Sequence, residues 1–403
     1  MTVGLSAPGV LHPVKGVMLA SCHSGIKKDS TIDDLVLMQF SDESSVAAVF
    51  TTNKFCAAPV TIAKQHLDSG HATRYLLINS GNANAGTGVE GVENCISTCA
   101  AIAAEASFPK QSVLPFSTGV IGAPLPVDKI SSAIPSLIKK LGEDNWLAAA
   151  KGIMTTDTLP KAVSRQLVIN GKKVTITGIC KGSGMIKPDM ATMLAYVATD
   201  ALIPQSELDS CLKQVVNSSF NSITVDGDTS TNDACLLIAT GVSQQSVSRT
   251  HDEFMSVLNE VFSLLAQSII RDGEGATKFI EIQVEQALSS QDARELAYTI
   301  AHSPLVKTAL FASDANWGRI LAAIGRAPIS SLDIDKVALF LGDVCLVKNG
   351  LPDEDYSEQK GQAVMQQQDI IIRVNLNQGE ESATIWTTDL SYDYVKINAE
   401  YRS

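Results

Sequence analysis

Hydrophobic residues recur along the chain with two different periods, and these periods predict its elements. Short apolar runs bounded by polar turns predict strands at residues 34–40, 46–51, 75–79, 166–169, 173–179, 192–199 and 279–285. Longer stretches with apolar residues on one helical face predict helices at residues 89–107, 128–141, 143–152, 209–218, 252–272, 293–310 and 315–326. Because strands alternate with helices in both halves, the predicted class is α/β or α+β.

Length and composition set the expected size of the core. The 403 residues, with 45% hydrophobic content, predict two or three folding units that bury a large core. Only 5% of the residues are aromatic, so small and β-branched side chains must fill that core, which suits tightly layered sheets and helices. The best candidate for a domain linker is a Ser- and Gln-rich patch at residues 288–292.

Charge and cysteine usage exclude several classes of protein. A net charge of −12 argues against nucleic-acid binding, which needs a basic surface to displace counterions. The N-terminus lacks the charged and apolar regions of a signal peptide, and no apolar run has the roughly 18–20 residues that span a bilayer. The eight cysteines and six histidines are scattered, so we expect reduced thiols, no metal site and a cytoplasmic protein.

Two glycine-rich strings superficially match nucleotide-binding motifs. Gly86–Gly91 matches G-x-G-x-x-G, but the preceding strand is predicted to end near Asn79, so the glycines do not leave the strand directly. We therefore expect a Gly- and Asn-rich loop that caps a helix, although a nucleotide-binding protein remains an alternative. Gly273–Lys278 lacks the spacing of a phosphate-binding loop.

The segment 181–200 offers different chemistry. A Gly-Ser-Gly sequence leads to Asp189 and then to an apolar run, Met190–Ala198, that predicts a strand buried on both faces. Thr192 in this run has two interpretations, an ordinary strand residue or a nucleophile. Cleavage of the bond before it would expose its α-amine, whose ordinary pKa of about 7.7–8.0 suits it to take the hydroxyl proton.

Strings throughout the chain resemble one known family. They are Phe50–Lys54, Ile78–Ala85, Ser117–Gly122, Met154–Thr158, Gly182–Ala195, Ser222–Asp233, Gly273–Lys278, Ser313–Arg319, Ile397–Ala399 and the terminal Ser403. Together they are similar to the ornithine acetyltransferase family, also called the arginine biosynthesis bifunctional glutamate N-acetyltransferase family. Because the strings are long and occur in the family's order over the whole chain, chance similarity is a poor explanation.

The resemblance implies a role for each matching residue. It implies self-cleavage between Ala191 and Thr192, with Thr192 as the nucleophile and with Thr118 and Gly119 as the oxyanion hole. The implied substrate-binding residues are Thr158, Lys181, Thr192, Glu274, Asn398 and Ser403. The chain departs from the family pattern at Lys187 and Asp189, which precede the cut, and at Ser403, which replaces a commoner threonine.

The resemblance also implies a fold and a reaction. The implied fold is a layered α-β-β-α sandwich over residues 1–285, followed by a smaller α/β domain over residues 286–403. The implied reaction moves an acetyl group from N2-acetyl-L-ornithine to L-glutamate through an acetylated Thr192, without a metal or organic cofactor. The fragments, residues 1–191 and 192–403, are expected to form an α2β2 heterotetramer. Two points stay open: acetyl-CoA as a second donor, and a self-cleaving amidohydrolase or aminopeptidase that uses water in place of glutamate.

Overall fold

The computed structural model describes residues 2–187 and 193–400, which divide into two compact units. The larger unit comprises Ser6–Asn221 and Asp228–Ile269, and the smaller unit comprises Met1–Leu5, Ser222–Gly227 and Ile270–Ser403. The sequence had placed the division after residue 285, whereas the structure divides the chain between Ile269 and Ile270. The reason is that the strand beginning at Phe279 pairs with two later strands, so it belongs to the smaller unit.

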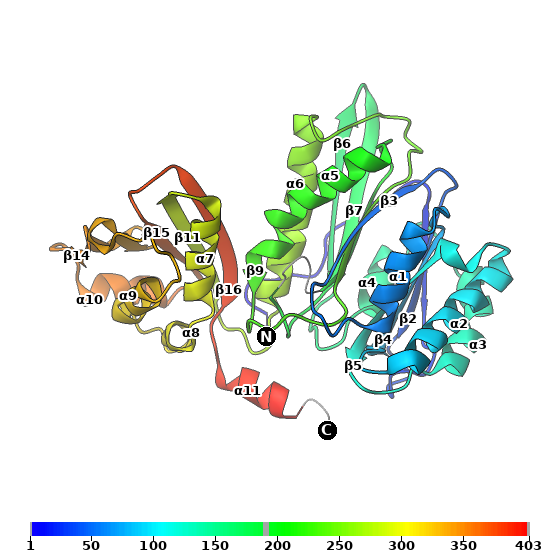
Figure 1. The fold of residues 1–403 in the computed structure, drawn as a ribbon, viewed down its shortest axis with the longest axis horizontal. Helices are drawn as coiled ribbons and strands as arrows, with labels where there is room; N and C mark the ends of the chain where they lie inside the picture. Colours follow the sequence, from blue (N-terminus) through cyan, green and yellow to red (C-terminus); the bar gives the residue numbers. More distant parts are fainter. Residues whose placement is uncertain (1, 188–192, 401–403) are drawn as a thin grey trace. The chain divides into compact units, whose positions relative to one another are not determined.

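Two sheets form the centre of the larger unit (Figure 1). The first sheet has the strand order β1 (Val17–Cys22), β2 (Leu35–Phe40), β4 (Tyr75–Asn82), β5 (Val113–Val120). The second has the order β3 (Ser45–Phe50), β10 (Ala234–Ala239), β8 (Leu194–Thr199), β7 (Lys172–Lys181), β6 (Lys161–Ile169). In each sheet one pair of neighbours is parallel, β4 with β5 and β8 with β10, and the other pairs are antiparallel.

The two sheets pack face to face because alternate residues of their strands are apolar. Leu76, Ile78 and Phe116 of the first sheet share one buried cluster with Tyr196 and Leu236 of the second. The Phe116 and Tyr196 rings meet edge to face, with centroids 5.3 Å apart. This inner core joins the two sheets into a sandwich.

The helices described in the larger unit are α1 (Ala58–Asp68), α2 (Gly88–Ala106), α3 (Val127–Lys139), α4 (Trp146–Gly152), α5 (Gln205–Asn217) and α6 (Asp252–Arg271), with short 3-10 turns at Lys110–Ser112 and Phe220–Ser222. Helix α4 contacts strands of both sheets and contributes to their inner core. Helices α2 and α3 bury their apolar faces against the first sheet, while α5 packs on β3 and α6 packs on β7 (Figure 1). The layers are therefore helix, sheet, sheet, helix, and the predicted α-β-β-α class is confirmed.

Helix α6 is the one described helix that is long and apolar enough to cross a membrane by length and composition. Half of its apolar window is buried, and the side chains of Phe254, Leu258, Phe262 and Leu265 are fully buried in the larger unit. Core helices of soluble proteins share these properties.

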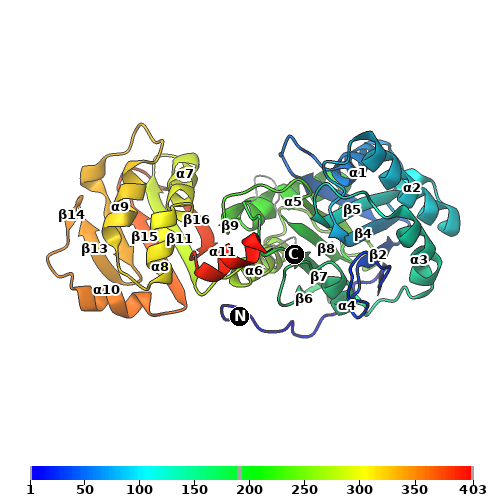
Figure 2. The same cartoon turned by 90° about the horizontal axis from the view of Figure 1, so that it is seen from below.

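A single seven-stranded sheet organises the smaller unit. Its order is β14 (Leu351–Pro352), β13 (Val344–Lys348), β12 (Ala338–Leu341), β15 (Asp369–Asn375), β11 (Phe279–Ala287), β16 (Glu381–Thr388), β9 (Ile223–Thr224). The helices are α7 (Ser290–Ala301), α8 (Pro304–Phe311), α9 (Trp317–Gly325), α10 (Glu358–Met365) and α11 (Tyr392–Ala399), with a 3-10 turn at Ile334–Lys336. Helices α7, α8 and α9 share one hydrophobic cluster with the sheet (Figure 2). Residues 286–403, predicted as a smaller α/β domain, form part of this unit.

Two local differences from the predictions have simple causes. The single helix predicted at 293–310 is two helices, because Ser303 caps α8 by accepting the Val306 N–H and Pro304 provides its first residue. Strand β5 was not predicted, because Pro115 and Gly119 interrupt its apolar pattern.

Candidate active site

The ends of three strands meet where the chain enters β8. Lys181, the last residue of β7, pairs with Leu194, and Leu194 pairs with Ala234, the first residue of β10. The Lys181 amine lies 3.4 Å from the Thr118 hydroxyl, which belongs to β5 of the facing sheet. The structure therefore brings two of the predicted site residues together between the two sheets. The predicted cleavage site at Ala191 and Thr192 lies outside the described residues, as does Ser403.

Gly119 occupies a position that only glycine fits. Its φ is +133°, and a Cβ built there would lie 2.3 Å from the carbonyl carbon of Gly81 on β4. Strands β4 and β5 therefore touch through glycine backbone, and their pairing register shifts at the same point. The close contact between the Gly119 and Gly81 backbones fixes the orientation of the peptide groups that follow Thr118.

Buried amide side chains hold the backbone before Thr118. The Asn232 side chain donates to the carbonyl oxygens of Ser117, at 2.9 Å, and Ala83, at 2.6 Å. The Ser117 hydroxyl donates to the Asn79 side chain at 2.6 Å. Sequence reasoning gave these asparagines no role, although they lie in the family-like strings, because their partners are brought together only by the tertiary fold.

Asp233 is the most perturbed carboxyl of this region. It directly precedes β10, its exposed fraction is 3%, and its Oδ2 has no hydrogen-bond partner among the described residues. Burial raises the pKa of Asp233 well above its ordinary value, although Ser230 and the charge of Lys181 oppose the shift. The next N–H, of Ala234, donates to the Met193 carbonyl at 2.9 Å, so this buried carboxyl stands beside the start of β8.

Thr158 lies in a loop that binds the β7–β8 connection. It is exposed and directly follows Asp157, whose buried carboxylate accepts the Gly182 N–H at 2.7 Å. The hydrogen bond between Asp157 and Gly182 therefore attaches the loop that carries Thr158 to the residue that follows Lys181.

The remaining predicted residues, Glu274 and Asn398, meet in the smaller unit. The Asn398 side chain donates to the Glu274 carboxylate at 2.9 Å. Gly275 has a φ of +69°, and a Cβ there would lie 2.4 Å from the Tyr394 nitrogen, so glycine lets helix α11 approach the Glu274 loop. Ser391 links the two by donating to the Gly275 carbonyl at 2.6 Å while it caps α11.

A buried lysine supports the same corner of the smaller unit. The Lys307 amine donates to the Thr387 hydroxyl at 3.1 Å and to the Thr388 carbonyl at the end of β16. Thr388 in turn lies against Gly273, where a Cβ would approach its methyl carbon to 2.9 Å. Burial lowers the pKa of Lys307 to about 8, although Asp389 and Asp226 oppose the shift.

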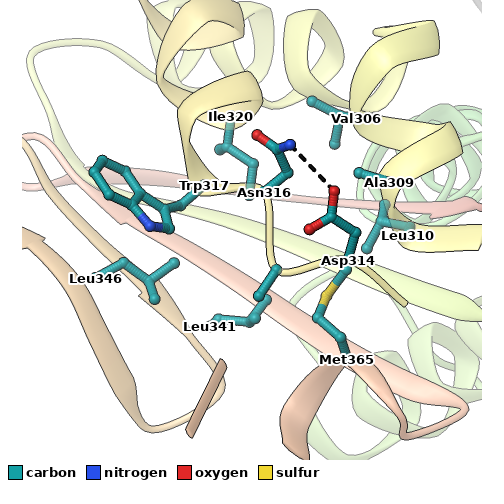
Figure 3. Close-up of a pocket in the computed structure, with 11 residues that line it drawn as sticks. Val306, Ala309, Leu310, Asp314, Asn316, Trp317, Ile320, Leu341, Leu346 and Met365 are labelled. Carbon is teal, nitrogen blue, oxygen red and sulfur yellow. Dashed lines mark hydrogen bonds between the residues drawn. The ribbon is translucent and has the colours of Figure 1, made fainter. Parts of the chain in front are cut away.

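Two other strings singled out in the sequence have structural positions. Ser313–Arg319 forms the turn between α8 and α9 and the first residues of α9, and Asn316 donates to Asp314 at 3.1 Å beside an apolar pocket (Figure 3). Gly86–Gly91 runs from a loop into the first turn of α2, which begins at Gly88, and Asn84 donates to the Gly91 carbonyl at 2.9 Å. Among the residues that the structure describes, no three His, Cys, Asp or Glu side chains are grouped so that they could hold a metal ion.

The ArgJ family model matches residues 18–403. This chain belongs to the ArgJ family. Its relatives include the arginine biosynthesis bifunctional proteins ArgJ of Pseudomonas fluorescens, 52% identical over 100% of both chains, and of Methylococcus capsulatus, 53% identical over 98% of this chain and 97% of the relative. The predicted family membership is confirmed.

Solved structures of ArgJ-related proteins are also similar to this chain. The arginine biosynthesis bifunctional protein ArgJ of Bacillus halodurans is 39% identical, with a TM-score of 0.48 over 50% of this chain and 95% of that chain. The ornithine acetyltransferase of Mycobacterium tuberculosis, solved with ornithine, is 34% identical, with a TM-score of 0.40 over 46% of this chain and 98% of that chain.

Proposed function

We propose that this chain transfers an acetyl group from N2-acetyl-L-ornithine to L-glutamate through an acetyl ester on Thr192, as an enzyme of arginine biosynthesis. The observation that carries the proposal is the 3.4 Å contact between the Lys181 amine and the Thr118 hydroxyl, at the point where the chain enters β8. Thr192 is the second residue before Leu194, with which β8 begins. Membership of the ArgJ family agrees with this activity.

The nucleophile is made by the chain itself. The Thr192 hydroxyl attacks the Ala191 carbonyl, the C–N bond between the two residues breaks, and water hydrolyses the resulting ester. The products are a carboxylate at Ala191 and a free α-amine at Thr192, so one residue supplies both nucleophile and base. Strand β7 belongs to the first fragment and β8 to the second, and their pairing supports continued association after the cut.

The transfer follows in two steps. The Thr192 hydroxyl attacks the acetyl carbonyl, the C–N bond to ornithine breaks, and ornithine leaves as the amine. The glutamate amine then attacks the ester, and the Thr192 oxygen leaves as the hydroxyl. Lys181 donates a hydrogen bond to the Thr118 oxygen, so the Thr118 hydroxyl hydrogen can be donated to the oxyanion of the tetrahedral intermediate. In this proposal Gly119 faces the same oxyanion. Neither step needs a metal or an organic cofactor.

The other predicted residues bind substrate in this proposal. The Lys181 ammonium suits the substrate α-carboxylate. Glu274, oriented by Asn398, supplies a carboxylate for an amino group of ornithine or glutamate. Thr158 and Ser403 complete the set. We also propose an α2β2 heterotetramer in the cytoplasm.

Mass spectrometry and an isotope assay test the proposal together. The wild-type chain should yield fragments of residues 1–191 and 192–403, and Thr192→Ala should remain one chain without activity. Acetylornithine labelled in its acetyl group should give labelled N-acetylglutamate, whereas labelled free acetate alone would indicate an amidohydrolase. A parallel reaction with acetyl-CoA and glutamate decides whether the enzyme is bifunctional. An active Thr192→Ala enzyme would contradict the nucleophile assignment.

A further inference from the structure

The segment Met154–Thr158, here called the bracket segment, joins helix α4 to strand β6 and contacts both sheets of the larger unit. On the first sheet it meets Lys27, which follows β1. The Lys27 amine donates to the Met154 carbonyl at 2.9 Å and to the Asp33 carbonyl at 3.2 Å. The first residue of the bracket segment is therefore attached to the loop between β1 and β2.

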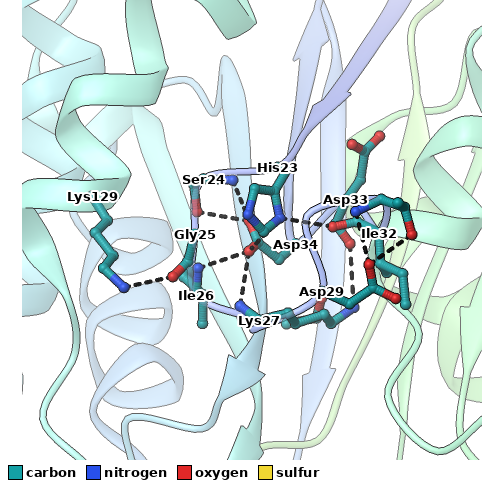
Figure 4. Close-up of polar contacts among 12 residues, drawn as sticks. His23, Ser24, Gly25, Ile26, Lys27, Asp29, Ile32, Asp33, Asp34 and Lys129 are labelled. Atoms are coloured by element: carbon teal, nitrogen blue, oxygen red, sulfur yellow. Dashed lines mark hydrogen bonds and ion pairs between the residues drawn. The ribbon is translucent and has the colours of Figure 1, made fainter.

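That loop is organised by hydrogen bonds to one buried carboxylate (Figure 4). The buried Asp34 carboxylate accepts the N–H groups of Ser24, Ile26 and Lys27 at 2.6, 2.8 and 2.9 Å. Burial alone would raise the pKa of Asp34, but these hydrogen bonds lower it, so the charged carboxylate organises the loop. Lys27 is thus held in place before it reaches the bracket segment.

The second sheet meets the bracket segment at Asp157. One Asp157 oxygen accepts both the Lys161 ammonium, at 2.6 Å, and the Gly182 N–H, at 2.7 Å. The other oxygen accepts the Thr155 N–H at 3.0 Å. The side chains of Asp157 and Lys161 are fully buried, so this pair is not a surface salt bridge.

The partner Gly182 begins the connection between β7 and β8. Its φ of +153° favours glycine, and a Cβ there would lie 3.4 Å from the Met193 Cβ at the far end of the connection. The next residue, Ser183, is attached to the bracket segment by a 2.7 Å hydrogen bond with Thr156. The Met193 carbonyl accepts the Ala234 N–H at 2.9 Å, so both ends of the connection are held.

We infer that Asp157 is a positioning residue for self-cleavage and for Lys181, acting through its charge-assisted hydrogen bond to the Gly182 N–H. This inference rests on the proposed function, which places the cut inside the connection that Gly182 begins. Intramolecular attack requires the reacting groups to be held in register, and a displacement of about 1 Å costs roughly 10²-fold in rate. Restraint at Gly182 also keeps the preceding residue, Lys181, opposite Leu194 and beside Thr118.

The arrangement requires a carboxylate rather than an amide. In each of the three described hydrogen bonds to Asp157 the partner is the donor, and only a carboxylate offers acceptors on both oxygens. An asparagine would turn its NH2 group toward one of these donors. Buried ion pairs contribute little net stability compared with an apolar pair, which favours a role in fixing geometry.

The test is the rate of self-cleavage of newly synthesised chain, followed by electrophoresis after cell-free translation. The deciding variant is Asp157→Asn combined with Lys161→Met, which keeps the side-chain volumes and leaves no unpaired buried charge. We expect its cleavage to be roughly 10–100-fold slower, with a melting temperature close to that of the wild type. The control is Glu260→Gln, which removes the carboxylate from the exposed ion pair between Arg165 on β6 and Glu260 on α6 and should cleave at the wild-type rate.

Each result has one consequence. Cleavage of the folded double variant at the wild-type rate would overturn the role of Asp157 and leave the proposed function intact. If the wild-type chain is not cleaved at all, the proposed function fails first. If the double variant melts below the assay temperature, the same variant is assayed in the cold, below its melting temperature, against Glu260→Gln. Slowed cleavage there supports the inference, and equal rates overturn it.

Discussion

The two units hold their predicted site residues in different ways. In the larger unit, Thr118 and Lys181 lie on strands of facing sheets, and Asn232 fixes the backbone next to Thr118 from within the core. In the smaller unit, Asn398 lies on helix α11, none of whose residues is buried, and the helix docks on the Glu274 loop through Gly275 and Ser391. Strand pairing leaves little freedom, whereas a docked terminal helix has few restraints.

This contrast suggests a division of roles. Groups that act on the reacting bond must be preorganised, and the larger unit supplies that rigidity. Groups that contact the more distant parts of a substrate tolerate adjustment, and in the proposed function these are Glu274 and Asn398 of the smaller unit. Substitutions in the larger unit should therefore change cleavage and kcat, and those in the smaller unit should change KM.

The largest effect is expected for Gly119→Ala. The new Cβ would lie 2.3 Å from the Gly81 backbone, so β4 and β5 must separate beside Thr118. Loss of one oxyanion donor costs about 10²–10³-fold in kcat, and we expect at least a loss of that size in acetyl transfer. Steady-state kinetics with acetylornithine and glutamate measures it.

A matched control is available at Gly122. Its φ of +84° is also positive, but a Cβ there would meet nothing within 4 Å. Gly122→Ala should therefore lose about 1 kcal/mol of stability from backbone strain alone and keep most of its activity. Equal loss of activity in both variants would show that backbone strain, and not the contact with β4, is responsible.

A smaller and different effect is expected for Gly275→Ala. The new Cβ would lie 2.4 Å from the Tyr394 nitrogen, so α11 must move away from the Glu274 loop and Asn398 must lose Glu274. We expect KM for acetylornithine to rise roughly tenfold, which corresponds to about 1.4 kcal/mol of binding energy, while self-cleavage is unchanged. Gly325→Ala, at the end of α9, meets nothing within 4 Å and serves as the control. Uncleaved Gly275→Ala protein would contradict the division of roles.

The sequence predicted the regular elements better than the polar contacts. Short apolar runs bounded by polar turns located β2 and β3 within one residue of their bounds. The sequence pattern missed β5, where Pro115 and Gly119 interrupt the apolar pattern and where the contact with β4 requires Gly119, and it joined α7 to α8 across Pro304. Local pattern therefore fails where a tertiary contact has selected the residue.

The candidate site shows the same limit. The family resemblance supplied Thr118, Lys181, Glu274 and Asn398, and the structure places the first two together and the last two together. The family resemblance did not assign a role to Asp157, because an aspartate with a lysine four residues later looks in the sequence like an ordinary polar pair. Only the contact with Gly182, 25 positions later in the chain, gives it a role.

The smallest effect concerns the pH dependence of the smaller unit. Burial lowers the pKa of Lys307 from 10.5 to about 8, so the folded state releases this proton before the unfolded state does. Between these pH values the unfolded state binds more protons, and stability must therefore rise with pH through this window. Relative to Lys307→Met, which has no amine to titrate, the wild type should gain about 1–2 kcal/mol of folding stability between pH 8 and pH 9.5.

Hydrogen exchange of the Thr387 and Thr388 amides at the end of β16 measures this gain in stability locally. Other groups that titrate in this range are present in both proteins, so their contributions cancel in the stability difference between the wild type and Lys307→Met. If this difference stays constant from pH 8 to pH 9.5, Lys307 keeps its ordinary pKa.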